Sequence, residues 1–159
     1  MWMLFLCGAL AAEPSLAFQD DGWLVGHVDI AASPDAVWAL VADPGQVARF
    51  DAGRETTSEP DGTCHKVTMT IRHPLASPTF HTRSCPDGER TVRQVLTGGD
   101  MAAFDAEWRV EARGDGTRLH HRWKGEPASY APQWIVHRMA LKGATKLMAA
   151  LRDHLEAQP

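Results

Sequence analysis

Residues 28–44 have the sequence VDIAASPDAVWALVADP, in which a strand, a capped helix and a second proline follow one another. The strand begins near Trp23 and alternates apolar with polar side chains, which is typical of a half-buried strand. Ser33 is a good helix N-cap, and a proline directly after it fits the first helical turn. Pro44 ends that helix and opens a second short one over residues 45–50. The fold therefore begins with a strand and two short helices.

The composition of the chain favours one domain. Its 159 residues, 44% of them apolar, suffice for a single hydrophobic core and leave little for a second one. The formal charge is −4, from 16 basic and 20 acidic residues, so the overall charge gives no sign of binding to DNA or RNA. We expect a single folded domain that does not bind nucleic acid.

The first 17 residues have the pattern of a signal peptide. Residues 1–12 are apolar and uncharged, and residues 15–17 (SLA) put small side chains at the two positions that signal peptidase recognises. The apolar run is too short to span a membrane. Cys7 follows bulky residues, unlike a lipoprotein cysteine. We expect residues 18–159 to be exported to the periplasm or secreted; the alternative is a cytoplasmic protein with an ordinary hydrophobic N-terminus.

The middle of the chain contains a series of strands separated by Asp-Gly turn sequences. Leu119, His121 and Trp123 share one face of the last strand, while charged side chains share the other. This alternation indicates an antiparallel sheet with one solvated face. We predict six strands after the two short helices, at residues 53–59, 64–73, 79–85, 90–96, 103–112 and 117–125.

A long helix is predicted at the C-terminal end. Its apolar positions recur with a period near 3.6 from Pro132 to about His154, and one face must be buried. The apolar side of this helix consists of Trp134, Leu141, Ala144, Met148, Leu151 and Leu155. The polar side consists of Lys142, Lys146 and Arg152.

This order of elements resembles the START-like (SRPBCC) superfamily, which includes polyketide cyclase/dehydrase, coenzyme Q-binding and Bet v 1-like proteins. The resemblance covers about residues 23–156 and rests on the segments 28–38, 43–44, 108–110 and 116–119. It implies an α+β helix-grip fold, in which a curved antiparallel sheet of about seven strands wraps the long C-terminal helix. It also implies an apolar cavity, because members bind lipids, sterols, quinones or polyketides.

The side chains that would line such a cavity come from the inner faces of the strands and from the apolar side of the long helix. An ordinary place in the core is the alternative for each of them. The expected cavity residues are Val67, Met69, Ile71, Gln94, Phe104, Trp108, Leu119, His121, Trp123, Trp134, Leu141 and Met148.

Two histidines are candidates for chemistry. By strand parity His73 and His121 point inward, where an imidazole can orient a polar group or transfer a proton. The commoner alternative is a buried histidine that satisfies one hydrogen-bond partner. No Cys-x-x-Cys pair or spaced Cys/His set is present, so we expect no metal, and we expect no cofactor.

Cys64 and Cys85 fall on adjacent predicted strands, nearly symmetric about the turn between them. Their parity puts both on the face opposite the apolar side chains, so that they can meet across the ladder. In an oxidising compartment a disulfide is favoured, and two unrelated surface thiols are the alternative.

Three functions are compatible with this sequence. The first is a carrier or sequestering protein for a lipid, quinone or polyketide-like molecule, with transient contact with a membrane left open. The second is a cyclase or dehydratase that uses His121 or His73, and the third is a protein-interaction module. The first needs only a cavity, whereas the sequence has no nucleophile motif or paired carboxylates to favour an enzyme. The ligand and the oligomeric state are not encoded in any spacing.

Overall fold

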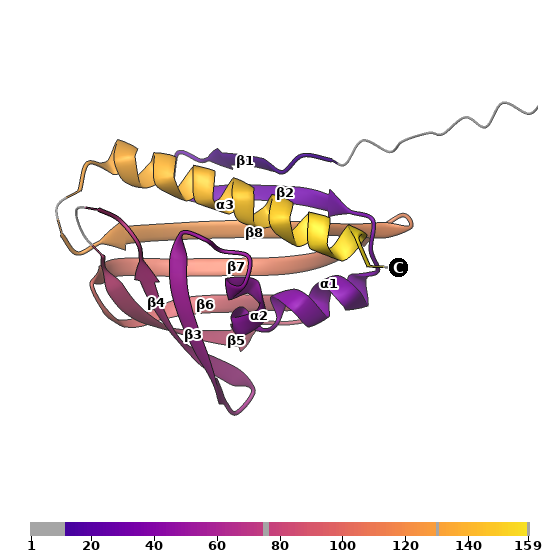
Figure 1. Ribbon diagram of the computed structural model, residues 1–159, viewed down its shortest axis with the longest axis horizontal. Coiled ribbons are helices and arrows are strands. Elements are labelled where there is room, and N and C mark those ends of the chain that lie inside the picture. The colour runs from indigo at the N-terminus through magenta and orange to yellow at the C-terminus, as the bar shows by residue number, and fades with distance from the viewer. Residues whose placement is uncertain (1–11, 75–76, 130, 159) are drawn as a thin grey trace, which may run out of the picture.

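The computed structural model describes residues 12–74, 77–129 and 131–158, which form one antiparallel sheet, two short helices and one long helix (Figure 1). The strand order across the sheet is β1-β2-β8-β7-β6-β5-β4-β3. The strands are β1 (Ser15–Phe18), β2 (Leu24–Ile30), β3 (Arg54–Asp61), β4 (Cys64–Ile71), β5 (Thr79–Pro86), β6 (Thr91–Gly99), β7 (Met101–Arg113) and β8 (Gly116–Pro127). The helices are α1 (Pro34–Val41), α2 (Pro44–Ala48) and α3 (Gln133–Glu156).

These elements confirm the predicted α+β helix-grip architecture, with one correction to the number of strands. The sheet of the described residues has eight strands instead of about seven. The additional strand is β1, whose residues pair antiparallel with β2, from Ser15 opposite His27 to Phe18 opposite Leu24. Leu16 packs against the core. Residues 15–17 thus belong to the sheet, while residues 1–11 lie outside the described residues and removal of a leader stays a prediction.

The two short helices form where their caps predict. The Ser33 hydroxyl accepts a hydrogen bond from the Ala36 amide at 3.2 Å, and Asp43 accepts one from the Gly45 amide at 2.8 Å. Prolines occupy the first turn of both helices. The buried face of α1 consists of Val37, Leu40 and Val41. The helix α1 contacts β7, β8 and α2, and α2 in turn contacts β3.

The core consists of two apolar clusters on the face of the sheet that packs against α3, which we call the inner face. The first cluster joins α1 and the C-terminal half of α3 to β2, β7 and β8, around Val37, Leu119 and Leu151. The second lies between β4, β5 and β7, around Val67, Phe80 and Phe104. Space remains where the two clusters meet.

The long helix is confirmed, but its buried side differs from the predicted one. Trp134 is 66% exposed and Leu141 36% exposed, whereas Arg152 is only 5% exposed. A period of 3.6 fixes which residues share a side, but not where the sheet lies beneath the helix, and buried residues begin only at Ala144. The guanidinium of the buried Arg152 donates to the Ala12 carbonyl and pairs with Asp153 at 2.7 Å, and these contacts compensate the burial of its charge. Among the residues described, no helix is long and apolar enough to cross a bilayer.

Candidate functional site

A cavity lies between the sheet and the N-terminal half of α3, in two adjoining parts. The outer chamber, of about 300 Å³, is bounded by α3, the ends of β4 and β5 and the segment after β8. The inner chamber, of about 60 Å³, extends between α2, β3 and the middle of the sheet. Residues common to both walls are Asp51, Arg54, Phe104, His121 and Trp123. These shared residues form the junction of the two chambers.

The walls of the outer chamber are mostly apolar. From the sheet come Ile71, Phe80 and Met101. From α3 come Ile135, Val136, Met139, Ala140 and Gly143, which recur every three or four residues along one side of the helix. His73 also lines this chamber, so both candidate histidines reach it.

Most of the predicted cavity residues line one of the two chambers. Those in the walls are Val67, Met69, Ile71, Gln94, Phe104, Trp108, His121 and Trp123. Four others are corrections. Leu119 and Met148 are fully buried in the first core cluster, where they pack among core side chains and line neither chamber. Trp134 and Leu141 point away from the cavity, since the side of α3 that faces it carries Val136, Ala140 and Gly143 instead.

His121 is a buried, neutral imidazole at the junction. Its Nδ1 donates a hydrogen bond to the Glu107 carbonyl at 3.1 Å, and its ring stacks on Trp108. Burial lowers the pKa of His121 to about 3, and the positive charge of Arg54 acts in the same direction. At neutral pH the hydrogen therefore sits on Nδ1, and Nε2 keeps a lone pair that can accept a hydrogen bond.

An ion pair that the sequence analysis missed stands beside His121. Arg54 Nε donates to Asp51 Oδ2 at 2.6 Å, and both residues line both chambers. Asp51 also accepts from the Gly53 amide at 3.2 Å, which shapes the turn that leads from α2 into β3. The Asp-x-x-Arg spacing in the sequence indicates that the two side chains can pair. It does not indicate that the turn they form lies over a cavity.

Gln94 supplies a further polar group of the inner chamber. Its Nε2 donates to the hydroxyl of Thr82 at 2.6 Å and lies 3.9 Å from the sulfur of Met69. This arrangement uses the amide hydrogens and leaves the carbonyl oxygen as an acceptor. The inner chamber thus holds two neutral acceptors, His121 Nε2 and Gln94 Oε1. Its other polar lining residues are the Arg54–Asp51 ion pair, Thr56 and Ser84.

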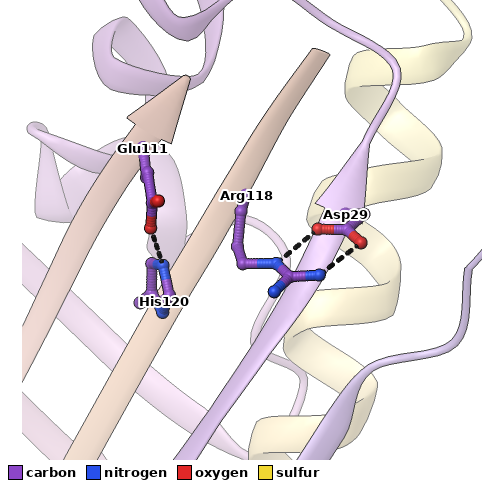
Figure 2. A network of polar contacts seen from close by, with 4 residues as sticks. All are labelled: Asp29, Glu111, Arg118 and His120. Carbon is purple, nitrogen blue, oxygen red and sulfur yellow. Dashed lines mark hydrogen bonds and ion pairs between the residues drawn. The ribbon is translucent and has the colours of Figure 1, made fainter. Parts of the chain in front are cut away.

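The opposite, outer face of the sheet is held together by ion pairs (Figure 2). Arg118 binds Asp29 through two hydrogen bonds of 2.6 and 2.7 Å, and His120 contacts Glu111 at 2.6 Å. The pKa of the Asp29 carboxyl is lowered, mainly by the hydrogen bond from Arg118. His120 and His121 point to opposite faces, so the pairs in Figure 2 are separate from the cavity.

The disulfide candidates also lie away from the cavity. Cys64 and Cys85 are bonded, with an S–S distance of 2.11 Å and Cα atoms 4.3 Å apart. The bond joins β4 to β5 on the side opposite the inner-face residue Val67. Across the described ranges, no group of three or more His, Cys, Asp and Glu side chains is placed to hold a metal ion.

Comparisons with known proteins agree with this architecture. A family model described as polyketide cyclase/dehydrase and lipid transport matches residues 24–158. A search of curated proteins finds no match.

Several solved structures are similar to this chain over nearly their whole length. A Thermus thermophilus protein has a TM-score of 0.74 at 17% identity, covering 85% of this chain and 97% of its own. A START superfamily protein from Mycobacterium smegmatis has a TM-score of 0.72 at 18% identity, and the match covers 86% of this chain and 99% of that protein. The Zhui aromatase/cyclase from a Streptomyces species has a TM-score of 0.67 at 15% identity, and the match covers 84% of this chain and 93% of that protein. At such identities the similarity shows the fold alone.

Proposed function

Because the chain belongs to the polyketide cyclase/dehydrase and lipid transport family, we propose that it binds a hydrophobic small molecule as a carrier or sequestering protein. The observation that carries the proposal is the cavity of about 300 Å³ between the sheet and α3. This volume falls at the lower end of small-molecule sites, which are about 300–1,000 Å³, mostly apolar and furnished with a few polar groups.

The two chambers support a particular orientation of the ligand. The apolar outer chamber suits a hydrocarbon chain or a ring system. The inner chamber offers His121 Nε2 and Gln94 Oε1, both acceptors, so it suits a hydroxyl group. We propose that the ligand enters polar end first, with the Arg54–Asp51 ion pair beside it at the junction.

A cyclase that uses His121 is the alternative, favoured by the convergence of His121, Gln94 and Arg54 on one small chamber. The state of His121 argues against the usual form of this chemistry. A pKa of about 3 leaves almost no imidazolium at neutral pH, so His121 has no proton on Nε2 to give. Its remaining chemical role is that of a weak base. The carrier function needs no proton transfer and therefore ranks first.

The proposal is tested by native mass spectrometry and lipid extraction of the protein purified from its own source. Gly143 lies in the wall of the outer chamber, and an added Cβ there meets no atom within 4 Å. We expect a bound apolar molecule in the wild-type protein and in the matched control Gly143→Ala, and its loss in Gly143→Phe, which fills the chamber.

Two results would count against the carrier function. One is a wild-type protein that is empty on purification and takes up neither a long-chain alcohol nor a quinone when these are added. The other is equal occupancy in the Ala and Phe variants, since the ligand would then bind somewhere else. Turnover of an added polyketide-like substrate that His121→Gln abolishes would favour the cyclase.

A further inference from the structure

We propose that the N-terminal half of α3 docks on an anionic membrane surface beside the mouth of the cavity. The surface in question, which we call the outer side of α3, consists of Trp134, Arg138, Leu141, Lys142 and Lys146. The inference rests on the proposed carrier function, because it describes how an apolar ligand reaches the cavity. Figure 1 shows this half of α3, in orange, at the end of the helix farthest from α1.

The charge of this segment is opposite to that of the whole chain. The net charge is −4, yet between Glu126 and Asp153 the sequence contains no acidic residue and four basic ones. Arg138, Lys142 and Lys146 are exposed, and none of them forms an ion pair within the described part of the chain. Several arginines of the sheet, by contrast, have an acidic partner, for example Arg93 on Asp105 and Arg118 on Asp29. The outer side of α3 is therefore a local cationic surface without internal counterions.

Large apolar side chains stand among these cations. Trp134 is 66% exposed and Leu141 36% exposed, and both belong to the few large apolar residues that the fold leaves in water. Spacings of four, seven and eight residues put Trp134, Arg138, Leu141 and Lys142 on one side of the helix. Trp and Leu combined with Lys and Arg on a surface helix are characteristic of helices that lie in the membrane interface.

The cavity opens next to this surface. Met139 is 40% exposed and also lines the outer chamber, so it lies at the lip between the cavity and the outer side of α3. Docking of the outer side on a bilayer would put this lip at the level of the headgroups. An apolar ligand would then pass between bilayer and cavity with little exposure to water.

A bilayer fits this surface better than a second copy of the chain does. In a twofold dimer the same patch occurs on both subunits, so the three unpaired cations would face three like charges. The apolar part of this surface is also limited to one short side of one helix. Its area is small compared with the total of about 1,600 Å² that a stable protein interface buries. An anionic lipid surface supplies the missing counterions and accepts a small apolar insertion.

The test is co-sedimentation of the full chain with vesicles of phosphatidylcholine alone or of phosphatidylcholine and phosphatidylglycerol in a 7:3 ratio. We expect binding to the anionic vesicles that weakens with added salt, and little binding to the neutral ones. Lys142→Glu with Lys146→Glu should weaken binding at least about tenfold, since each basic residue near an anionic surface contributes about 1 kcal/mol. Trp134→Ala should weaken binding to the anionic vesicles.

The matched control is Lys66→Glu with Arg109→Glu, which changes the net charge equally on exposed side chains of the outer sheet face. This control should retain most of the binding. The proposal is overturned if the wild type binds neither vesicle, or if both double variants bind alike. Dimerisation that only the α3 variant abolishes, without vesicle binding, would assign the surface to a second copy.

Ligand occupancy, measured separately by native mass spectrometry, distinguishes this proposal from the carrier function. The Lys142→Glu/Lys146→Glu variant should keep the ligand of the wild type, because neither side chain lines the cavity. Vesicle binding by a protein that is always empty would remove the carrier function and leave the docking surface standing. A protein that carries a ligand but does not bind anionic vesicles would remove the docking surface and leave the carrier function standing.

Discussion

The ring of His121 stacks on that of Trp108, with the two centroids 3.9 Å apart and the planes inclined by 22°. The indole thus covers one face of the imidazole, and a backbone carbonyl takes its Nδ1 hydrogen. The hydrogen bond to the carbonyl by itself raises the pKa of His121, but burial of the ring outweighs it. A protonated His121 would be a poorly hydrated charge in the middle of the protein.

The protein should lose stability in acid because of His121. Its pKa is about 3 in the folded chain, against an ordinary value of 6.5, so the unfolded chain binds the extra proton between these values. The free energy of unfolding should therefore rise with pH from about 3 to about 6.5 and level off above that. Urea unfolding at pH 4.5 and 7.5 measures this difference.

His121→Gln should show a smaller difference between the two pH values, because the glutamine cannot titrate. His81→Gln is the control, since His81 is exposed and its hydrogen bond to Thr68 lies on the outer face. This variant should keep the pH dependence of the wild type. Equal pH dependence in His121→Gln and the wild type would contradict a buried neutral His121.

The Cys64–Cys85 disulfide should stabilise the fold. The bond closes a loop with a sequence separation of 21 residues, and constraining a loop of this size in the unfolded chain is worth about 3 kcal/mol. The Cys64→Ser/Cys85→Ser variant should lower the free energy of unfolding by about that amount, measured in urea. Thiol labelling of protein recovered from the cell provides a second measurement, in which two freely reactive thiols at these positions would argue against the bond.

Strand β1 should contribute to stability although it overlaps the predicted leader. A chain that begins at Phe18 lacks residues 12–17, and its Arg152 loses the Ala12 carbonyl as a hydrogen-bond partner. A buried group left without its partner costs about 1–3 kcal/mol. We expect the chain that begins at Phe18 to unfold at lower urea than the chain that begins at Ala12.

Gly26 provides a test of whether this difference comes from β1 itself. A Cβ at Gly26 would lie 2.3 Å from the Ser15 carbonyl oxygen, which leaves no room for the strand. Gly26→Ala should therefore destabilise the chain that begins at Ala12 and hardly affect the one that begins at Phe18. Equal effects in both chains would show that β1 does not pair with β2. The intact mass of the protein from its source then tells which start the cell uses.

Gly143→Ala should stabilise the protein while leaving the cavity open. Glycine within a helix is less favourable than alanine by about 0.8–1.0 kcal/mol. The added methyl group meets no atom within 4 Å, so no clash offsets this gain. Thermal unfolding of the ligand-free protein should give a higher midpoint for Gly143→Ala than for the wild type. A lower midpoint would mean that the space beside Gly143 is occupied.

Local patterns predicted the elements that depend on neighbouring residues. The cap at Ser33 and the prolines fixed the start of α1 and α2, and alternation along β8 put Leu119 and His121 on the inner face. Hydrogen bonding to the next residues and strand parity do not depend on the rest of the chain, so one sequence suffices for them.

The features that the sequence did not predict correctly all depend on relations between distant segments of the chain. Leu16 and Phe18 alternate with smaller residues, a signal for β1, but they follow an apolar run that looks like a leader. Periodicity put Trp134 on the apolar side of α3, yet it cannot tell how far the sheet extends beneath a helix. Likewise, the pairing of Asp51 with Arg54 is local, but its place at the cavity depends on how α2 packs against β3.

The two halves of α3 differ in how firmly they are held. Leu147, Leu151 and Leu155 are buried in the core, and Glu156 near the end of the helix accepts a hydrogen bond from the Ala31 amide at 2.9 Å. Before Ala144, by contrast, none of the described α3 side chains is fully buried. The first turns should therefore unwind transiently at a much lower free energy than the whole domain needs to unfold. The rate of ligand exchange would then follow the local stability of residues 133–143, and a variant that stiffens these turns would slow uptake and release alike.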